Sequence, residues 1–128
     1  MRLVADQRPD EAFDQFKSAV AKACPAGVTV DVKLIHGAPP SLVNPNNDFI
    51  RAAATAMEQV FGNKTVYIRS GGSIPIVGSF ERALGIPSVL MGFGLPDDNL
   101  HSPNEKFYLP NFYRGIEAVA RFIELAGK

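Results

Sequence analysis

The sequence predicts an α/β protein, because segments typical of strands alternate along the chain with segments typical of helices. Residues 28–34 alternate apolar and polar side chains, which is the period of a strand with one buried face. Residues 48–60 instead repeat apolar side chains at helical spacing. A chain of 128 residues has the length of one ordinary domain or of two small lobes. We expect two lobes, separated by a short linker at residues 37–41.

The first lobe, residues 1–36, is expected to be a single β-α-β unit. Residues 1–5 are typical of a strand, and Pro9 with two acidic residues then begins a helix that ends before Pro25. The strand at residues 28–34 completes the unit. Because one such unit leaves the edges of its sheet unpaired, the lobe is expected to recruit a second chain.

The second lobe, residues 42–128, begins after a glycine and two prolines that stiffen the linker. Asn47 and Asp48 cap a helix that Gly62 ends. Strands are expected at residues 65–68 and 88–93, joined by a glycine turn and a helix with Ile76, Val77, Phe80 and Leu84 inward. A final helix, from about residue 111 to 126, is expected to bury Ile116, Val119, Ala120 and Ile123.

The composition favours a globular protein and argues against several classes of partner. The 13 basic and 13 acidic side chains cancel, so no net charge attracts nucleic acid or an anionic membrane. No apolar run approaches the ~18 residues of a membrane-spanning helix, and no signal or transit peptide is evident. The single cysteine, Cys24, excludes an intrachain disulfide and fits a reducing compartment. We therefore predict a cytoplasmic protein that binds neither nucleic acid nor membrane.

The polar loop at residues 95–105 carries the most informative candidate residue, His101. The loop follows an apolar run, and α/β sheets place ligand sites in loops at the carboxyl ends of buried strands. Neutral imidazole is the commonest metal ligand, and Asp98, Asn104 and Glu105 are neighbours that would orient its second nitrogen. Without a His-x-Asp, His-x-His or His-Glu-x-x-His motif, however, a hydrogen-bonded loop histidine is the more frequent outcome of this pattern.

A glycine turn at residues 71–73 is the candidate anion site. Backbone N–H groups near Gly72 and the hydroxyl of Ser73 precede a predicted helix, where an anion would be stabilised. The turn matches neither a P-loop nor Gly-x-Gly-x-x-Gly, so a plain turn with a serine N-cap is equally well supported. Arg69 would add a fixed positive charge. Arg2, on the first expected strand, is by pattern alone a solvated edge residue.

Two motifs together resemble a known enzyme family. The first runs Arg69-Ser-Gly-Gly-Ser-Ile-Pro-Ile76, and the second is Gly94-x-x-Asp-Asp-x-x-His-Ser-x-Asn-Glu105. In this order and spacing they resemble the carboxyl-terminal part of the zinc metallopeptidases and amidohydrolases that include aminoacylases, carnosine dipeptidases, glutamate carboxypeptidases and succinyl-diaminopimelate desuccinylases. The opening residues and His36-Gly37 resemble the last β-α-β unit of that family's lid domain. The resemblance spans essentially the whole chain.

The resemblance implies a cofactor, a substrate class and roles for particular residues. In the complete enzymes two zinc ions share an active site, and the histidine that matches His101 binds one of them. The residues that match Ser73, Gly72 and Arg2 contact the substrate, a small peptide or an N-acyl amino acid. Behind these contacts, supporting positions are expected for Arg69, Asp98, Asn104 and Glu105. A homo-oligomer is expected separately, from the unpaired strand edges of the first lobe.

The remaining zinc ligands, the bridging aspartate and the general base belong to the amino-terminal half of that family. Because a zinc ion takes ~4 donors, His101 alone cannot hold one. We therefore expect a fragment that is inactive alone and carries no catalytic residue. Its residues 1–36 would be a partial lid (dimerisation) domain, and residues 42–128 the end of a phosphorylase/hydrolase-like α/β catalytic domain. Two alternatives stay open, a stand-alone carboxylate- or anion-binding module without metal and a dimerisation module.

Overall fold

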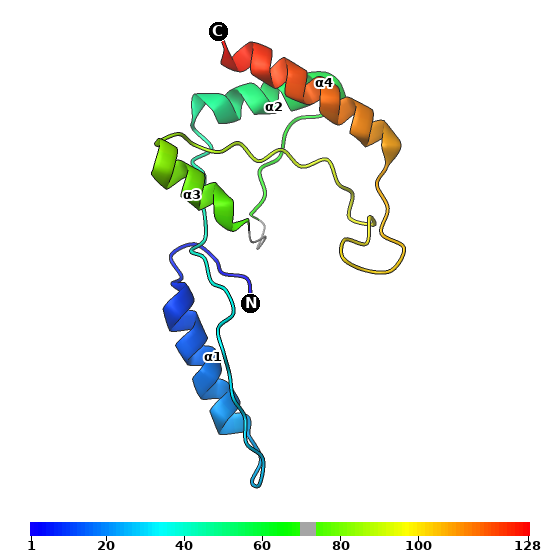
Figure 1. The fold of residues 1–128 in the computed structure, drawn as a ribbon. Coiled ribbons are helices and arrows are strands. Elements are labelled where there is room, and N and C mark those ends of the chain that lie inside the picture. Colours follow the sequence, from blue (N-terminus) through cyan, green and yellow to red (C-terminus); the bar gives the residue numbers. More distant parts are fainter. Residues whose placement is uncertain (70–73) are drawn as a thin grey trace. The chain divides into compact units, whose positions relative to one another are not determined.

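The computed structural model describes residues 1–69 and 74–128, and within them the chain forms helices joined by turns and extended segments (Figure 1). None of the described residues belongs to a strand, and none of the described helices is both long and apolar enough to cross a membrane. The predicted α/β fold class, a lid-type β-α-β lobe followed by part of an α/β catalytic domain, is therefore wrong for this structure. The helices are α1 (Pro9–Ala23), α2 (Asp48–Phe61), α3 (Pro75–Leu84) and α4 (Leu109–Ala126).

The expected strands fail to form because no neighbouring strand pairs with them among the described residues. Outside the helices, the backbone hydrogen bonds of these residues close turns and caps instead of joining two extended segments. Many of the apolar side chains that predicted burial are correspondingly exposed, Val66 for example by 78%. A strand is stabilised by the N–H and C=O groups of its neighbour and by a covered face, and local alternation supplies neither.

By its internal contacts the chain divides into two units. Unit 1 comprises Met1–Leu42 and Arg69–Ile86, and unit 2 comprises Val43–Ile68 and Pro87–Lys128. The division predicted from the sequence, at residues 37–41, concerns the domains of a complete enzyme and stays a prediction.

Unit 1 contains α1 and α3. Helix α1 begins and ends where the sequence predicts, with a proline in its first turn and a basic residue in its last. The Arg8 guanidinium, hydrogen-bonded to Asp10, lowers the pKa of that carboxyl to about 2. After α1 the chain reverses at Gly27, whose φ of 82° suits glycine, and runs back beside the helix (Figure 1). A Cβ at Gly37 would lie 3.2 Å from the side chain of Pro9.

Helix α3 buries less of its surface than the sequence predicts. Of the side chains expected to face inward, Val77 is buried, with 5% of its surface exposed. The other three large apolar side chains, those of Ile76, Phe80 and Leu84, are exposed. The expectation of a full inward face is wrong because the described part of unit 1 packs no second helix against α3. Among the side chains of α3 that the structure describes, Val77 is therefore the contribution to the core.

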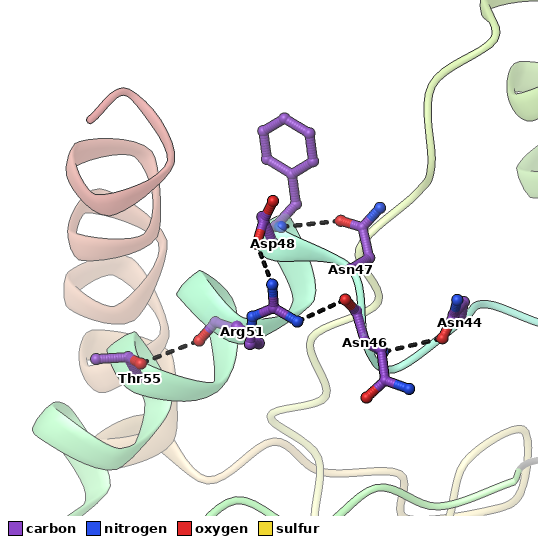
Figure 2. Close-up of polar contacts among 7 residues, drawn as sticks. Asn44, Asn46, Asn47, Asp48, Arg51 and Thr55 are labelled. Atoms are coloured by element: carbon purple, nitrogen blue, oxygen red, sulfur yellow. Dashed lines mark hydrogen bonds and ion pairs between the residues drawn. The ribbon is translucent and has the colours of Figure 1, made fainter.

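In unit 2, polar side chains define the start of α2, as Figure 2 shows. Asn47 is the N-cap, and its Oδ1 accepts a hydrogen bond from the backbone N–H of Phe49 at 2.8 Å. Arg51 reaches back to pair with Asp48 and to donate to the Asn46 carbonyl at 2.5 Å. The helix ends at Gly62, which has a left-handed φ of 72° and donates to the Glu58 carbonyl at 2.9 Å. Both ends of α2 confirm the sequence prediction.

The core of unit 2 lies between α2 and α4, which run side by side (Figure 1). Small side chains line this contact. Ala56 on α2 and Ala118 on α4 are both 0% exposed, and Ala53 and Gly115 are also buried. Small residues let two helix backbones approach closely.

Because its small residues face α2, helix α4 leaves a row of large apolar side chains exposed. Ile116, Val119, Ala120 and Ile123, which the sequence predicts to be buried, are all exposed, Ile123 by 64%. This prediction is wrong because α4 carries two apolar faces at helical spacing, and periodicity does not distinguish them. We call the exposed face the outer stripe, formed by Phe112, Ile116, Val119 and Ile123.

The cap of α2 gives a first prediction. Asn47→Ala should lower the free energy of unfolding by about 1 kcal/mol, because it removes the acceptor for the Phe49 N–H. Asn46→Ala is the matched control, since Asn46 contributes its backbone N–H and carbonyl to the cap network. Urea denaturation followed by circular dichroism compares the two variants. An equal loss in both would contradict a specific capping role.

The two faces of α4 give a second prediction. Ala118→Leu should destabilise the α2–α4 pair by about 1–3 kcal/mol, because no space is left for three further carbon atoms at a fully buried alanine. Val119→Leu, at the adjacent exposed position, should change the free energy of unfolding far less. The same denaturation experiment decides this point, and a larger effect at position 119 would reverse the assignment of faces.

Candidate functional site

The candidate site is the loop of residues 94–106, called here the His101 loop, which leads from extended residues into α4. Asp98 lies at its centre with 1% of its surface exposed. Its Oδ2 accepts a hydrogen bond from the backbone N–H of Leu95 at 2.6 Å, and its carbonyl oxygen accepts one from the backbone N–H of Lys106 at 3.0 Å. Asp98 therefore ties the first residues of the loop to the last.

From Asn99 to Asn104 the backbone adopts an unusual conformation. Asn99, His101 and Asn104 have φ values of 54°, 61° and 61°, in the left-handed region that side chains with a Cβ rarely occupy. Ser102 stabilises the first turn, because its N–H and its hydroxyl both donate to the Asn99 carbonyl, at 3.0 and 2.7 Å. In this conformation His101 is exposed to solvent.

An ion pair also spans the His101 loop. The Nζ of Lys106 donates to Oδ2 of Asp97 at 2.5 Å, and both side chains are more than half exposed. This hydrogen bond to the ammonium group holds the pKa of Asp97 below its ordinary value and raises the pKa of Lys106. Because the pair is exposed to solvent, its contribution to stability is small.

The loop is attached to the helix pair through Phe93. The buried side chain of Asn111, on α4, donates to the Phe93 carbonyl at 3.0 Å. The Phe93 ring stacks on Phe61 of α2, with ring centroids 6.3 Å apart, and a Cβ at Gly115 would lie 3.3 Å from it. The guanidinium of Arg114 lies 5.8 Å from the Phe61 centroid. The position from which the loop departs is therefore fixed by the α2–α4 core.

The remaining candidates divide between the two units. His101, Asp98, Asn104 and Glu105 share one loop in unit 2, whereas Arg2 and Arg69 belong to unit 1. Gly72 and Ser73 lie outside the described residues. In unit 1, Arg2 is the one charged residue lining an open hollow of about 540 Å³, which is otherwise lined by Met1, Leu3, Gln7, Ala12, Gln15, Phe16 and Ala19.

Sequence reasoning did not identify how the loop is held together. Asp98 was expected to support His101 through its ring, whereas the structure shows it bound to the backbone at Leu95 and Lys106. Asn111 was missed, although an asparagine on the inner face of an otherwise apolar helix is a signal for a buried hydrogen bond. The Asp97–Lys106 pair joins residues nine positions apart, and no sequence pattern indicates it.

His101 is the metal ligand expected from the sequence. No three histidine, cysteine or acidic side chains gather into a possible metal site among residues 1–69 and 74–128. The described residues therefore do not fit a zinc site by themselves. An exposed imidazole on an ordered loop fits the role of one ligand in a site completed by other groups.

Comparison with known proteins assigns the chain to a family. Residues 3–125 match the family described as Peptidase family M20/M25/M40. The chain belongs to this family. A Cys-Gly metallodipeptidase of Candida albicans is 37% identical over 97 residues, which are 76% of this chain and 20% of that protein. A human Beta-Ala-His dipeptidase is 34% identical over 96 residues, 74% of this chain and 19% of that protein. The resemblance expected from the two motifs is confirmed.

The backbone of this chain superposes on part of two solved structures of the family. The dipeptidase Dug1p of Saccharomyces cerevisiae superposes with a TM-score of 0.83 at 30% identity, over 95% of this chain and 26% of that one. The metallo-carboxypeptidase Sso-CP2 of Sulfolobus solfataricus gives a TM-score of 0.73 at 27% identity, over 96% of this chain and 28% of that one. This M20 chain thus spans about a quarter of the length of these two relatives.

The ion pair of the loop gives a third prediction. The carboxyl of Asp97 should titrate below the ordinary value of 3.8, and Lys106→Gln should raise its pKa toward that value. Because the folded pKa is the lower one, the pair stabilises the fold above the unfolded pKa, and this contribution is lost as the pH falls through the folded value. Carbon-13 NMR of the Asp97 carboxyl measures its pKa in the wild type and in Lys106→Gln. Lys64→Gln serves as the surface control. An unchanged Asp97 midpoint in the Lys106 variant would rule the interaction out.

Proposed function

We propose that this chain supplies one metal ligand, His101, to a metal-dependent hydrolase of the M20 family. The observation that carries the proposal is the ordered loop, in which Asp98 ties together both ends of a segment that presents an exposed imidazole. Family membership provides the chemical context, because the matched relatives are named as metallodipeptidases and dipeptidases. The proposed metal is zinc, two ions in each complete active site, as the family resemblance implies.

The proposed substrate class is a dipeptide or an N-acyl amino acid. The relatives' names specify Cys-Gly and Beta-Ala-His dipeptides, which share a free carboxylate at one end. Arg2 is proposed to bind that carboxylate, since a guanidinium pairs with it through two parallel hydrogen bonds. Ser73 and Gly72 are proposed to contact the same end of the substrate. Arg69, Asn104 and Glu105 would support these contacts.

The isolated chain is proposed to be catalytically inactive. It spans 20% of the Candida albicans relative and 26% of the Saccharomyces cerevisiae one. Zinc takes ~4 donors, and metal-assisted hydrolysis further needs a base within reach of the bound water. His101 is one donor, so the other groups have to come from elsewhere.

Hydrolysis of the named dipeptides tests this proposal. The purified 128-residue chain, incubated with zinc and either Cys-Gly or Beta-Ala-His, should release amino acids no faster than a protein-free blank. His101→Ala is the matched variant, and it should give the same blank rate. Hydrolysis that a chelator abolishes and that His101→Ala loses would show a complete site in this chain. Carboxylate binding without metal, measured by calorimetry, would instead support the alternative of a stand-alone binding module.

Self-association is a second proposed property, supported by the outer stripe. Phe112, Ile116, Val119 and Ile123 place four exposed apolar side chains along one face of α4. Contiguous apolar surface of this kind favours burial against a partner, and two-fold pairing of identical faces is the commonest solution.

Sedimentation equilibrium at micromolar concentration gives a fourth prediction. The wild-type chain should show a mass above the monomer value of 13.8 kDa. Ile116→Glu should shift the distribution toward the monomer, because it places a charge in the proposed interface. Glu117→Lys, on the neighbouring polar surface, serves as the control and should leave the mass unchanged. A single 13.8 kDa species in the wild type would contradict self-association.

A further inference from the structure

The Asp98 carboxyl group is unusual for a buried polar side chain. It is buried to 99%, yet its Oδ1 has no hydrogen-bond partner among the described residues. A buried carboxylate oxygen without a partner is costly, so each instance in a folded protein calls for an explanation. Such groups persist where the surrounding structure needs the rest of the side chain in that position.

The rest of the Asp98 side chain fixes residue 98 at the start of the His101 loop, and the backbone carbonyl of residue 98 closes the loop. Oδ2 binds the N–H of Leu95, and the carbonyl of the same residue binds the N–H of Lys106. The backbone bond from Lys106 to Asp98 encloses residues 99–105, which include the left-handed positions Asn99, His101 and Asn104. Asparagine and histidine adopt the left-handed region more readily than most other residues with a side chain, so the sequence permits this conformation, and the bonds at Asp98 stabilise it.

Gly94 shows that the space around Asp98 is restricted. A Cβ at Gly94 would lie 3.3 Å from Oδ2 of Asp98, whereas a Cβ at Gly92, two residues earlier, meets nothing within 4 Å. Neither glycine has the positive φ that would by itself disfavour alanine. The two positions thus form a matched pair. Alanine at position 94 would crowd the Asp98 carboxyl, whereas alanine at position 92 would not.

We infer that Asp98 is a positioning residue for His101, which it acts on through the backbone of the loop and not through the imidazole ring. The inference rests on the proposed function, in which His101 is a metal ligand. What the loop requires at position 98 is a buried hydrogen-bond acceptor at Oδ2, and the negative charge is not required. Asparagine should therefore replace Asp98, because an amide NH2 at the place of the unpartnered Oδ1 removes no hydrogen bond.

Nitrogen-15 NMR of the metal-free 128-residue chain tests this inference. In the wild type, residues 99–105 should show order parameters of rigid backbone, about 0.85. In Asp98→Ala these should fall below about 0.6, with a change in the His101 amide and ring shifts, while α4 keeps its values. Asp98→Asn should restore the wild-type pattern. Asp97→Asn, which removes the exposed ion pair, should leave residues 99–105 ordered.

The glycine pair keeps the test valid if Asp98→Ala fails to fold. Gly94→Ala should shift the amide signals of Leu95, His101 and Lys106, whereas Gly92→Ala should perturb its immediate neighbours alone. Unchanged order in Asp98→Ala, or identical loop spectra in the two glycine variants, would overturn the inference. Because all measurements are made without metal, they can fail while His101 still proves to be a ligand, and they can succeed while His101 does not.

Discussion

The close contact between α2 and α4 is the interaction on which unit 2 depends. Alanines at positions 56 and 118 are fully buried, and they bring the two helix backbones together. That contact also places Phe61 and Asn111 where they bind the ring and the carbonyl of Phe93. The His101 loop departs from Phe93 and returns to the first turn of α4, so both of its ends rest on the helix pair. A ligand-bearing loop needs such a rigid base, because errors in its position pass directly to the ligand.

Elsewhere in the chain, the sequence pattern and the observed burial disagree. Strand-like segments lie extended without a partner, and the outer stripe of α4 is exposed. Two apolar faces on one helix are typical of an element that is covered on both sides. This chain covers one of them, with α2. The match to relatives of which it spans 19% to 28% is consistent with this partial burial.

The sequence predicted the features that are determined locally. Both ends of α2 follow from Asn47 and Gly62, and the limits of α1 follow from two prolines. His101 and its neighbours were correctly placed in one loop, because they are adjacent in the chain. The α/β fold and the burial of Ile116 were predicted wrongly, since sheet pairing and the choice between two apolar faces depend on contacts between distant segments. For the same reason, the backbone role of Asp98 became visible only in the structure.

Zinc stoichiometry tests most directly the claim that this chain contributes one ligand to a site that other groups complete. The measurement is zinc retained per chain after equilibrium dialysis and gel filtration, determined by atomic absorption, with His101→Ala alongside. We expect neither protein to retain a stoichiometric amount of zinc, because a single imidazole is too few donors for a stable site. One or more equivalents of zinc retained by the wild type and lost in His101→Ala would contradict it.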